Sequence, residues 1–354
     1  MQPRDLSAHA EYRAGRGADE VARDLGLDPD ELVVLSSNEN PLGPSPRAIA
    51  AVRSSAPEIA TYPKAAHVDL TEAVAAQWTV DPEQVWLGNG GDGALDYLAR
   101  AVLAPGDTVL VPDPGFAYYA MSARYHHGEV RTYSVEKARG FALDVETVMS
   151  DYDGERIVYL TSPHNPTGSR FPVDDVATIA AETDDRTLIV VDEAYAEFAE
   201  GESAVSLIQR GDVAVIRTFS KAYGLAGLRI GYALVPAVWA SAYARVTTPF
   251  AVNVLACRAG MAALDDQEHV RKTVETARWS RNYLREELDY PTWESHANFV
   301  LVEVGDASTV ASTLENRGVL VRDCTSFGLP ECIRITCGTD SGTQRVVKEL
   351  NSIR

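Results

Sequence analysis

The chain has 354 residues, of which 45% are hydrophobic, so it can bury a large core and form one large and one smaller domain. It carries 51 acidic and 32 basic residues, a net charge of −19. Because that field repels phosphates at long range, it excludes nucleic acid and anionic membranes as partners. No apolar run reaches the roughly 20 residues of a membrane span. The N-terminal sequence also lacks the apolar core of a signal peptide, so we expect a cytoplasmic protein.

Lysine accounts for only five of the 32 basic residues, and the other 27 are arginine. An acidic chain with so little lysine is typical of salt-loving microbes, whose protein surfaces stay soluble at high salt. The four cysteines form no Cys-x-x-Cys pair, and the histidines are scattered along the chain. We therefore expect no metal site.

The first 240 residues predict an arm followed by an α/β domain. Residues 1–35 are expected to form an N-terminal arm with a helix at 18–25, followed by a loop rich in proline and glycine at 36–46. From residue 84, short apolar runs alternate with helical segments, the pattern of a mostly parallel sheet between helices. Strands are expected at 84–88, 108–111, 156–161, 187–192, 213–218 and 230–235, and helices at 46–55, 67–78, 93–103, 116–124, 173–182 and 203–209.

After about residue 240 the pattern changes to that of a smaller α+β domain. One long helical region is predicted over 250–289. Strands at 298–304, 319–322 and 332–337 and helices at 306–316 and 340–352 are predicted to follow it. The predicted organisation is an arm (1–35), a large domain (36–240) and a small C-terminal domain (241–354), in the α/β class.

The segment Arg217–Tyr232 places Lys221 after a short apolar run, at the carboxyl end of a predicted buried strand. Ligands of α/β sheets bind at such ends. Thr218 and Ser220 precede this lysine and Arg229 follows it. An amine can form an imine with a carbonyl cofactor, while hydroxyls and a guanidinium can hold a phosphate. For Ser-Lys followed by glycines alone, an exposed lysine in a turn remains the alternative.

The run Ser220–Tyr232, S-K-A-Y-G-L-A-G-L-R-I-G-Y, resembles the lysine segment of pyridoxal-phosphate-dependent aminotransferases with the aspartate aminotransferase fold. The resemblance implies fold type I, with a mostly parallel sheet in the large domain, and a pyridoxal 5′-phosphate cofactor. Lys221 would be the catalytic residue, and Thr218, Ser220 and Arg229 would contact the cofactor.

The turn Gly88–Gly93 matches G-x-G-x-x-G between a predicted strand and helix, which also fits an NAD-dependent oxidoreductase. Backbone N–H groups at a helix start bind any phosphate, so the turn suits other cofactors equally. The aminotransferases have a similar turn, and the resemblance places Gly90, Gly91 and Asp92 at the cofactor phosphate. Gly91 and Gly93 depart from the family's usual residues.

Two further segments extend the resemblance in the family's order. The segment 111–119 resembles the loop whose aromatic residue, here Phe116, stacks on the cofactor ring; without the family, an aromatic packed in the core is the alternative. The segment 161–168 resembles S-P-N-N-P-T-G, with His164 at the first asparagine. It places Asn165 at the phenolate oxygen of the cofactor.

The predicted strand at 187–192 ends in Asp192, and a buried carboxylate is costly unless a cation pairs with it. A protonated pyridine nitrogen is such a cation, and in the family Asp192 would keep it protonated. Tyr195 would share the phenolate oxygen with Asn165. A magnesium site of an ATPase is the alternative for Asp-Glu, but the chain has no G-x-x-x-x-G-K-S/T turn.

The ends of the chain resemble the histidinol-phosphate aminotransferase family in particular. The matching segments are 38–46, 62–63, 297–299, 320–323 and 332–339. The resemblance places Arg322 and Arg334 at the substrate phosphate, where two guanidiniums match a dianion. The alternative for Arg322 is an inert pair with Asp323. Tyr12, Asn40 and Tyr62 are expected at the site, with Tyr62 reaching the cofactor phosphate of a neighbouring subunit, which implies a homodimer.

This resemblance implies transamination of L-histidinol phosphate with 2-oxoglutarate, giving imidazole-acetol phosphate and L-glutamate in histidine biosynthesis. Lys221 would hold the cofactor and then move the α-proton as base and acid. A threonine-phosphate decarboxylase and an aromatic amino-acid aminotransferase are alternatives within the fold. The NAD-dependent oxidoreductase that would use Gly88–Gly93 is the alternative from another class.

Overall fold

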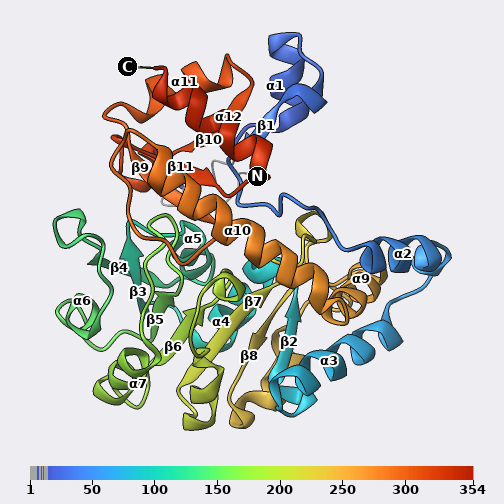
Figure 1. Cartoon of the computed structure of the whole chain (residues 1–354). Helices are drawn as coiled ribbons and strands as arrows, with labels where there is room; N and C mark the ends of the chain where they lie inside the picture. Colours follow the sequence, from blue (N-terminus) through green and yellow to red (C-terminus); the bar gives the residue numbers. More distant parts are fainter. Residues whose placement is uncertain (1–5, 8, 10, 12–14, 354) are drawn as a thin grey trace.

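The computed structural model describes residues 6, 7, 9, 11 and 15–353, which build two β-sheets (Figure 1). The larger sheet has the order β2-β8-β7-β6-β5-β3-β4. Strands β3 to β7 pair in parallel, whereas β8 is antiparallel to both of its neighbours. Its strands are β2 (Val85–Gly88), β3 (Thr108–Asp113), β4 (Glu129–Ser134), β5 (Ile157–Thr161), β6 (Leu188–Asp192), β7 (Val213–Thr218) and β8 (Gly231–Leu234).

The predicted mostly parallel sheet is confirmed, and the six predicted strands are found within two residues of their expected ends. Strand β4 was not predicted. It lies at the edge of the sheet and most of its side chains are exposed, so Glu-Val-Arg-Thr-Tyr-Ser has no apolar run to reveal it.

The strands of the large sheet contribute side chains to two separate hydrophobic cores, one on each face of the sheet. In β5, Val158 and Leu160 join one core, whereas Ile157 and Tyr159 join the other. Successive side chains of a strand point to opposite faces, so a strand buried on both faces is apolar throughout. This double burial explains why these strands could be recognised as continuous apolar runs.

The longer helices cover both sheets and connect them (Figure 1). The helical region predicted over 250–289 is wrong as one helix, because Asp265 and Asp266 interrupt it. The carboxylate of Asp266 accepts the backbone N–H of His269 and so begins a new helix. The helices are α1 (Ala18–Leu25), α2 (Pro46–Ser55), α3 (Lys64–Trp78), α4 (Gly90–Val102), α5 (Tyr118–Tyr125), α6 (Val145–Met149), α7 (Val173–Glu182), α8 (Tyr243–Val246), α9 (Val254–Leu264), α10 (Gln267–Glu287), α11 (Ala307–Glu315) and α12 (Asp340–Asn351).

The smaller sheet has the order β1-β10-β11-β9, and three of its strands lie near the C-terminus. These are β9 (Phe299–Glu303), β10 (Val319–Asp323) and β11 (Cys332–Thr336). The fourth, β1 (Val33–Leu35), was not predicted; it pairs in parallel with β10. The N-terminal segment therefore contributes a strand to the C-terminal sheet. The predicted domain boundaries at residues 35 and 240 stay predictions.

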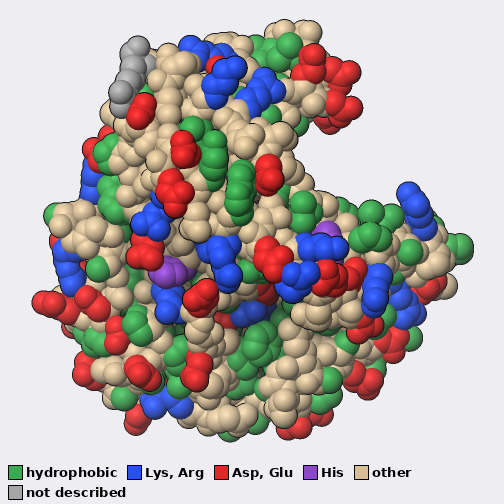
Figure 2. Space-filling view, viewed as in Figure 1, with side chains coloured by type: hydrophobic (Ala, Val, Ile, Leu, Met, Phe, Trp, Pro, Cys, Tyr) green, Lys and Arg blue, Asp and Glu red, His purple; other side chains and the backbone are tan. Residues whose placement is uncertain are grey.

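The surface carries many carboxylates, and Figure 2 shows Asp and Glu side chains scattered over the visible face. The net charge of the chain is −19. Among the helices of the described residues, none combines the length and the apolar composition that crossing a membrane requires.

The carboxyl ends of β2, β3, β5, β6 and β7 all point to one edge of the large sheet, since β8 alone runs against them. Each of the five predicted cofactor motifs follows one of these strands. The fold therefore brings together residues as far apart in the sequence as Asp92 and Arg229, which are separated by 137 positions, at the edge where α/β sheets bind ligands.

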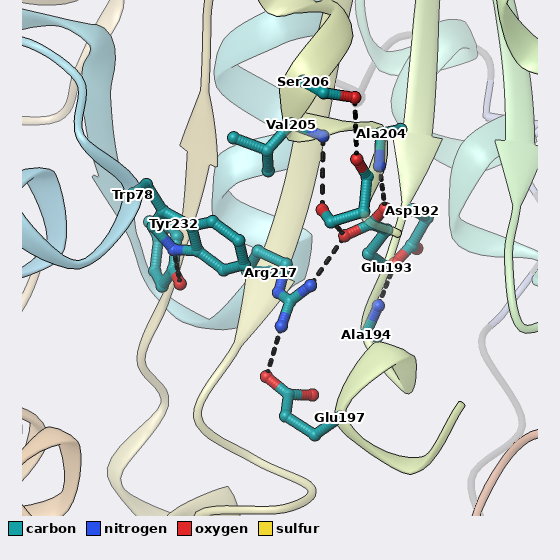
Figure 3. A network of polar contacts seen from close by, with 11 residues as sticks. Trp78, Asp192, Glu193, Ala194, Glu197, Ala204, Val205, Ser206, Arg217 and Tyr232 are labelled. Atoms are coloured by element: carbon teal, nitrogen blue, oxygen red, sulfur yellow. Dashed lines mark hydrogen bonds and ion pairs between the residues drawn. The ribbon is translucent and has the colours of Figure 1, made fainter. Parts of the chain in front are cut away.

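A buried ion-pair network fixes the ends of β6 and β7 (Figure 3). Arg217 donates from Nη1 to Glu193 Oε2 at 2.6 Å and from Nη2 to Glu197 Oε1 at 2.7 Å. Its guanidinium carbon lies 4.7 Å from the centroid of the Trp78 ring. The side chains of Arg217 and Glu193 are only 6% and 5% exposed. Because Asp192 precedes Glu193 in the chain, this network anchors the backbone beside the predicted cofactor carboxylate.

We expect the Arg217→Met variant to be destabilised by about 3–5 kcal/mol, because the buried Glu193 and Glu197 would lose their cation. The matched control is Arg210→Met, whose partner Asp212 lies at the surface with a side chain 29% exposed. An exposed pair contributes about 1 kcal/mol or less. Urea denaturation of both variants at one salt concentration measures the difference, and equal losses would contradict the assigned importance of the network.

Candidate active site

The amine of Lys221 lies between the large sheet and the N-terminal segment. Its Nζ donates to the backbone oxygen of Ser37 at 3.1 Å and lies 5.8 Å from the centroid of the Tyr195 ring. Burial, together with the positive charge of Arg334, lowers the pKa of Lys221 to about 8. More of this amine is therefore neutral near neutral pH than of an ordinary lysine, as a nucleophile or a base requires.

The carboxylate of Asp192 ends β6 beside Thr161, its register partner at the end of β5. Tyr119 Oη donates to Asp192 Oδ2 at 2.7 Å, and the backbone N–H of Ala194 donates to Oδ1 at 3.0 Å. Both donors are neutral, and burial raises the pKa of Asp192 to about 6. A cationic ligand nitrogen at this carboxylate would offset the cost of burying its charge. The residues present thus fit a protonated pyridine.

Tyr119 was not among the predicted site residues. It is fully buried and stacks on Tyr159 at 4.8 Å between ring centroids. Its hydroxyl also lies 2.8 Å from Thr161 Oγ1, so three neighbouring elements hold it against Asp192. The only sequence signal was its place three residues after Phe116, in the same loop. Phe116 itself packs edge-on against Tyr119 at 5.5 Å.

The start of α4 forms a cradle with Arg229. Gly90 has φ +73°, and a Cβ there would lie 2.5 Å from Arg229 Nη2, so only glycine lets the guanidinium come this close. Arg229 Nη2 donates to Asp92 Oδ2 at 3.0 Å. Burial raises the pKa of Asp92, and the positive charge of Arg229 opposes that rise. A helix N-terminus beside a guanidinium suits a phosphate.

The two hydroxyl residues before Lys221 lie at the carboxyl end of β7. Thr218 Oγ1 accepts the backbone N–H of Ser220 at 3.1 Å, and both residues are buried. Gly91, a departure from the family's pattern, faces the Ile216 side chain, which would lie 3.5 Å from an added Cβ. Because that distance is an ordinary van der Waals contact, the larger residue usual in the family would also fit here, and the turn does not require Gly91.

The strand order contradicts the dinucleotide interpretation of Gly88–Gly93. A Rossmann unit places the two strands that flank its glycine-rich turn and helix side by side. In this sheet β8, β7, β6 and β5 lie between β2 and β3. The chain therefore has the motif without the fold that makes it a dinucleotide site.

The loop after β5 brings Asn165 to Arg334. Arg334 donates from Nη1 to Asn165 Oδ1 and from Nη2 to the backbone oxygen of Ser36 at 2.9 Å. Because the amide oxygen faces Arg334, the Nδ2 donors of Asn165 point away from it. His164 is fully buried and hydrogen-bonds through Nδ1 to Thr167 at 2.8 Å; burial lowers its pKa to about 4. It is therefore neutral and supports the loop.

Arg322 and Arg334 lie directly opposite each other on the antiparallel strands β10 and β11. Like charges at such positions repel, so this spot suits a ligand with more than one negative charge. Arg322 Nη2 donates to Ser326 Oγ at 3.1 Å. Asp323, the alternative partner from the sequence, accepts the hydroxyl of Ser308 at 2.6 Å.

Asn38 was also not predicted as a site residue, although it links three parts of the site. Its Nδ2 donates to Tyr195 Oη at 3.0 Å, and its backbone N–H donates to Thr336 Oγ1 at 3.0 Å. Asn298 Nδ2 donates to its backbone oxygen at 3.0 Å. Asn38 has φ +54°, which asparagine tolerates better than most residues. An asparagine in the proline-rich loop was the available signal.

The structure places Asn40 behind Lys221. Its Nδ2 donates to the backbone oxygen of Ala222 at 2.9 Å and to Thr273 Oγ1 at 3.0 Å. The side chain thus supports the turn that carries the lysine. Tyr12 lies outside the described residues.

Tyr62 lies at the surface, 73% exposed and stacked on Phe250 at 4.6 Å between ring centroids.

The described residues contain no group of three His, Cys, Asp or Glu side chains that could hold a metal ion.

Comparisons with known proteins agree with this geometry. The family model for aminotransferase class I and II matches residues 30–350. The histidinol-phosphate aminotransferase of Haloarcula marismortui is 65% identical over 354 residues, covering 100% of this chain and 98% of that protein. The corresponding protein of Haloferax volcanii is 62% identical, with 100% and 98% coverage. Both organisms are halophilic archaea, consistent with the acidic composition.

Solved structures show the same fold. Histidinol-phosphate aminotransferase from Sinorhizobium meliloti, in complex with pyridoxal 5′-phosphate, superimposes with a TM-score of 0.86 at 28% identity, covering 96% of this chain and 95% of that one. A double mutant of Thermus thermophilus aspartate aminotransferase gives 0.83 at 26% identity, with 100% coverage of both chains. The predicted fold type I is therefore confirmed. The chain belongs to the class I and II aminotransferases and, within them, to the histidinol-phosphate aminotransferases.

Proposed function

We propose that this chain transfers the amino group of L-histidinol phosphate to 2-oxoglutarate, giving imidazole-acetol phosphate and L-glutamate, with pyridoxal 5′-phosphate as cofactor. The observation that carries this proposal is that Arg322 and Arg334 lie opposite each other on neighbouring antiparallel strands, and that the charge of Arg334 acts on Lys221. A phosphate monoester offers the two negative charges that such a pair binds. The relatives at 57–65% identity carry the same activity in their names.

Each part of the cofactor would contact a different element. The N-terminus of α4 at Gly90 and Gly91, together with Asp92 and Arg229, would surround the phosphate, and Thr218 and Ser220 would close the cradle. Asp192 would pair with the ring nitrogen, Asn165 and Tyr195 would bond the phenolate oxygen, and Phe116 would cover the ring. When bound, the cofactor supplies a carbonyl for the incoming amino group and a ring that withdraws electrons.

Lys221 would carry the proton transfer. A lysine with an ordinary pKa is charged near pH 7 and cannot accept a proton, whereas burial lowers the pKa of this one to about 8. Its Nζ can therefore take the α-proton of the substrate and return it as the acid. Asn38 would orient Tyr195, because its Nδ2 donates to the Tyr195 oxygen.

Arg322 and Arg334 would hold the substrate phosphate. Arg334 also holds Asn165 and Ser36, so its guanidinium is fixed before the substrate arrives. Tyr12 remains a proposed substrate-binding residue. The role of Asn40 would be indirect, through the backbone of Ala222 beside Lys221.

The chain would act as a homodimer with shared sites. Uncovered apolar side chains occur on the segments around α2 and α3, with Ile59 69%, Tyr62 73% and Val68 55% exposed. Figure 2 shows hydrophobic side chains on the projection that α2 forms, and a hollow between it and the part carrying α1. A second copy that covers this surface would bring Tyr62 of one protomer to the cofactor phosphate of its partner.

Lys221→Ala tests the reaction itself. We expect glutamate formation from histidinol phosphate and 2-oxoglutarate to fall to background, because the amine that moves the proton is gone. Borohydride treatment of the parent protein with bound cofactor should label the peptide that contains Lys221. The matched control is Lys272→Ala on the exposed surface of α10, which should remain active. Release of carbon dioxide without glutamate would instead indicate a decarboxylase, and faster turnover of phenylalanine an aromatic aminotransferase.

Asp192 predicts how cofactor binding depends on pH. Before a cation pairs with it, its pKa is raised to about 6 by burial, so below that pH the carboxyl group is protonated and cannot pair with a cationic ring nitrogen. We expect the affinity for pyridoxal 5′-phosphate to fall as the pH drops through about 6. Asp192→Asn should lose about 100-fold in kcat, since breaking a buried charge pair costs about 3 kcal/mol. Asp212→Asn at the surface is the control, and a variant at Asp192 that kept the parent's rate and the parent's loss of cofactor affinity at acid pH would refute the assignment.

Mixed dimers test the shared site. Tyr62→Ala and Lys221→Ala proteins should each be poorly active alone. Hybrid dimers isolated with two affinity tags should recover about half the parent activity, because one of their two sites then has both an intact lysine and an intact tyrosine. Hybrids no more active than their parents, or a protein that sediments as a monomer, would exclude this arrangement.

A further inference from the structure

The turn that follows β10 holds an aromatic ring against both substrate-side arginines. The ring centroid of Phe327, the last residue of the short 3-10 helix Thr325–Phe327, lies 5.6 Å from the guanidinium carbon of Arg322 and 5.9 Å from that of Arg334. Both distances are in the range of cation–π attraction. One side chain therefore touches both members of a pair of like charges.

Hydrogen bonds within the turn hold its backbone. The backbone N–H of Phe327 donates to Cys324 O at 2.8 Å, and that of Leu329 donates to the same oxygen at 3.2 Å. The carboxylate of Asp323 accepts the backbone N–H of Thr325 at 2.8 Å. The side chains of Cys324 and Leu329 are buried, so the turn is also anchored in the core. Phe327 is thus held in place by the protein itself.

The ring belongs to a series of contacts that begins at Tyr195. Tyr195 packs edge-on against Phe299 at 5.2 Å, and Phe299 lies 5.2 Å from the guanidinium of Arg334. Phe327 extends these contacts from Arg334 to Arg322. Arg334 has two aromatic neighbours and a buried side chain, whereas Arg322 is half-buried and contacts Phe327 and Ser326.

We propose that Phe327 is a positioning residue that holds Arg322 and Arg334 together in the geometry that binds a phosphate dianion, and so determines the preference for phosphorylated amino donors. This inference rests on the proposed function. Two guanidiniums on facing residues repel each other, and the negative face of a shared ring offsets that repulsion. Holding long side chains ready also lowers the entropy lost on binding. Each carboxylate of 2-oxoglutarate carries one charge and is satisfied by one guanidinium, whereas a phosphate concentrates two charges in one group, so 2-oxoglutarate gains less from the pair.

The test compares Phe327→Leu, which keeps the apolar volume but removes the π face, with Phe327→Tyr, which keeps the ring. We expect Phe327→Leu to raise the KM for histidinol phosphate about tenfold and that for 2-oxoglutarate less than about threefold, with kcat within about twofold of the parent. The inhibition constant of inorganic phosphate, measured against L-glutamate as amino donor, should rise about as much as the first value. Phe327→Tyr should keep the KM for histidinol phosphate, the KM for 2-oxoglutarate and the inhibition constant of phosphate close to the parent values.

Thermal unfolding shows whether each variant is folded, and Phe327→Met is the second ring-free variant if leucine does not pack. A double-mutant cycle with Arg322→Met should show coupling, because Phe327 acts through that arginine. Unchanged KM and phosphate inhibition in a folded ring-free variant overturns the proposal, as does an equal loss for both substrates together with a lower kcat. If the parent protein does not use histidinol phosphate, the proposed function fails, while phosphate inhibition still decides the role of Phe327.

Discussion

The direction of the strands in the large sheet is the constraint on which the site depends. Because β3, β5, β6 and β7 are parallel and β2 runs the same way, their carboxyl ends meet at one edge. Lys221, Asp192, Asn165 and Gly90 each follow a different strand and need no long loop to reach one another. The buried Arg217 network then fixes two of these ends, so the precision of the site comes from backbone pairing and one ion-pair cluster.

Much of this arrangement could be predicted from sequence, for physical reasons. Strands buried on both faces are continuously apolar, and motifs that follow such strands lie at the ligand-binding edge. The features that were missed lack a local signal. Strand β4 is polar because it is an edge, and β1 is a strand only because β10, nearly 300 residues away, pairs with it. The break at Asp265 looks helical on both sides, and only the cap at Asp266 marks it.

The side chains that were missed act through tertiary contacts. Tyr119 becomes important only when β6 brings Asp192 to its hydroxyl, and Asn38 only when β11 and Tyr195 surround it. Their residue types are common, and their places in the sequence, three residues after Phe116 and in the proline-rich loop, do not by themselves show which groups they contact. The resemblance to the family assigned roles to several residues, but only their positions in the folded chain give a physical reason for those roles. The register that sets Arg322 opposite Arg334 is one example, since two arginines twelve residues apart imply no meeting by themselves.

The segment from Ser36 to Asn40 has a consequence for motion in this molecule. It continues directly from β1, which belongs to the small sheet, yet it touches the lysine, the tyrosine and the arginine of the site through Ser37, Asn38 and Ser36. A rotation of one sheet against the other would therefore move residues that contact the site. Closing over a substrate and adjusting the surroundings of the lysine would then occur together.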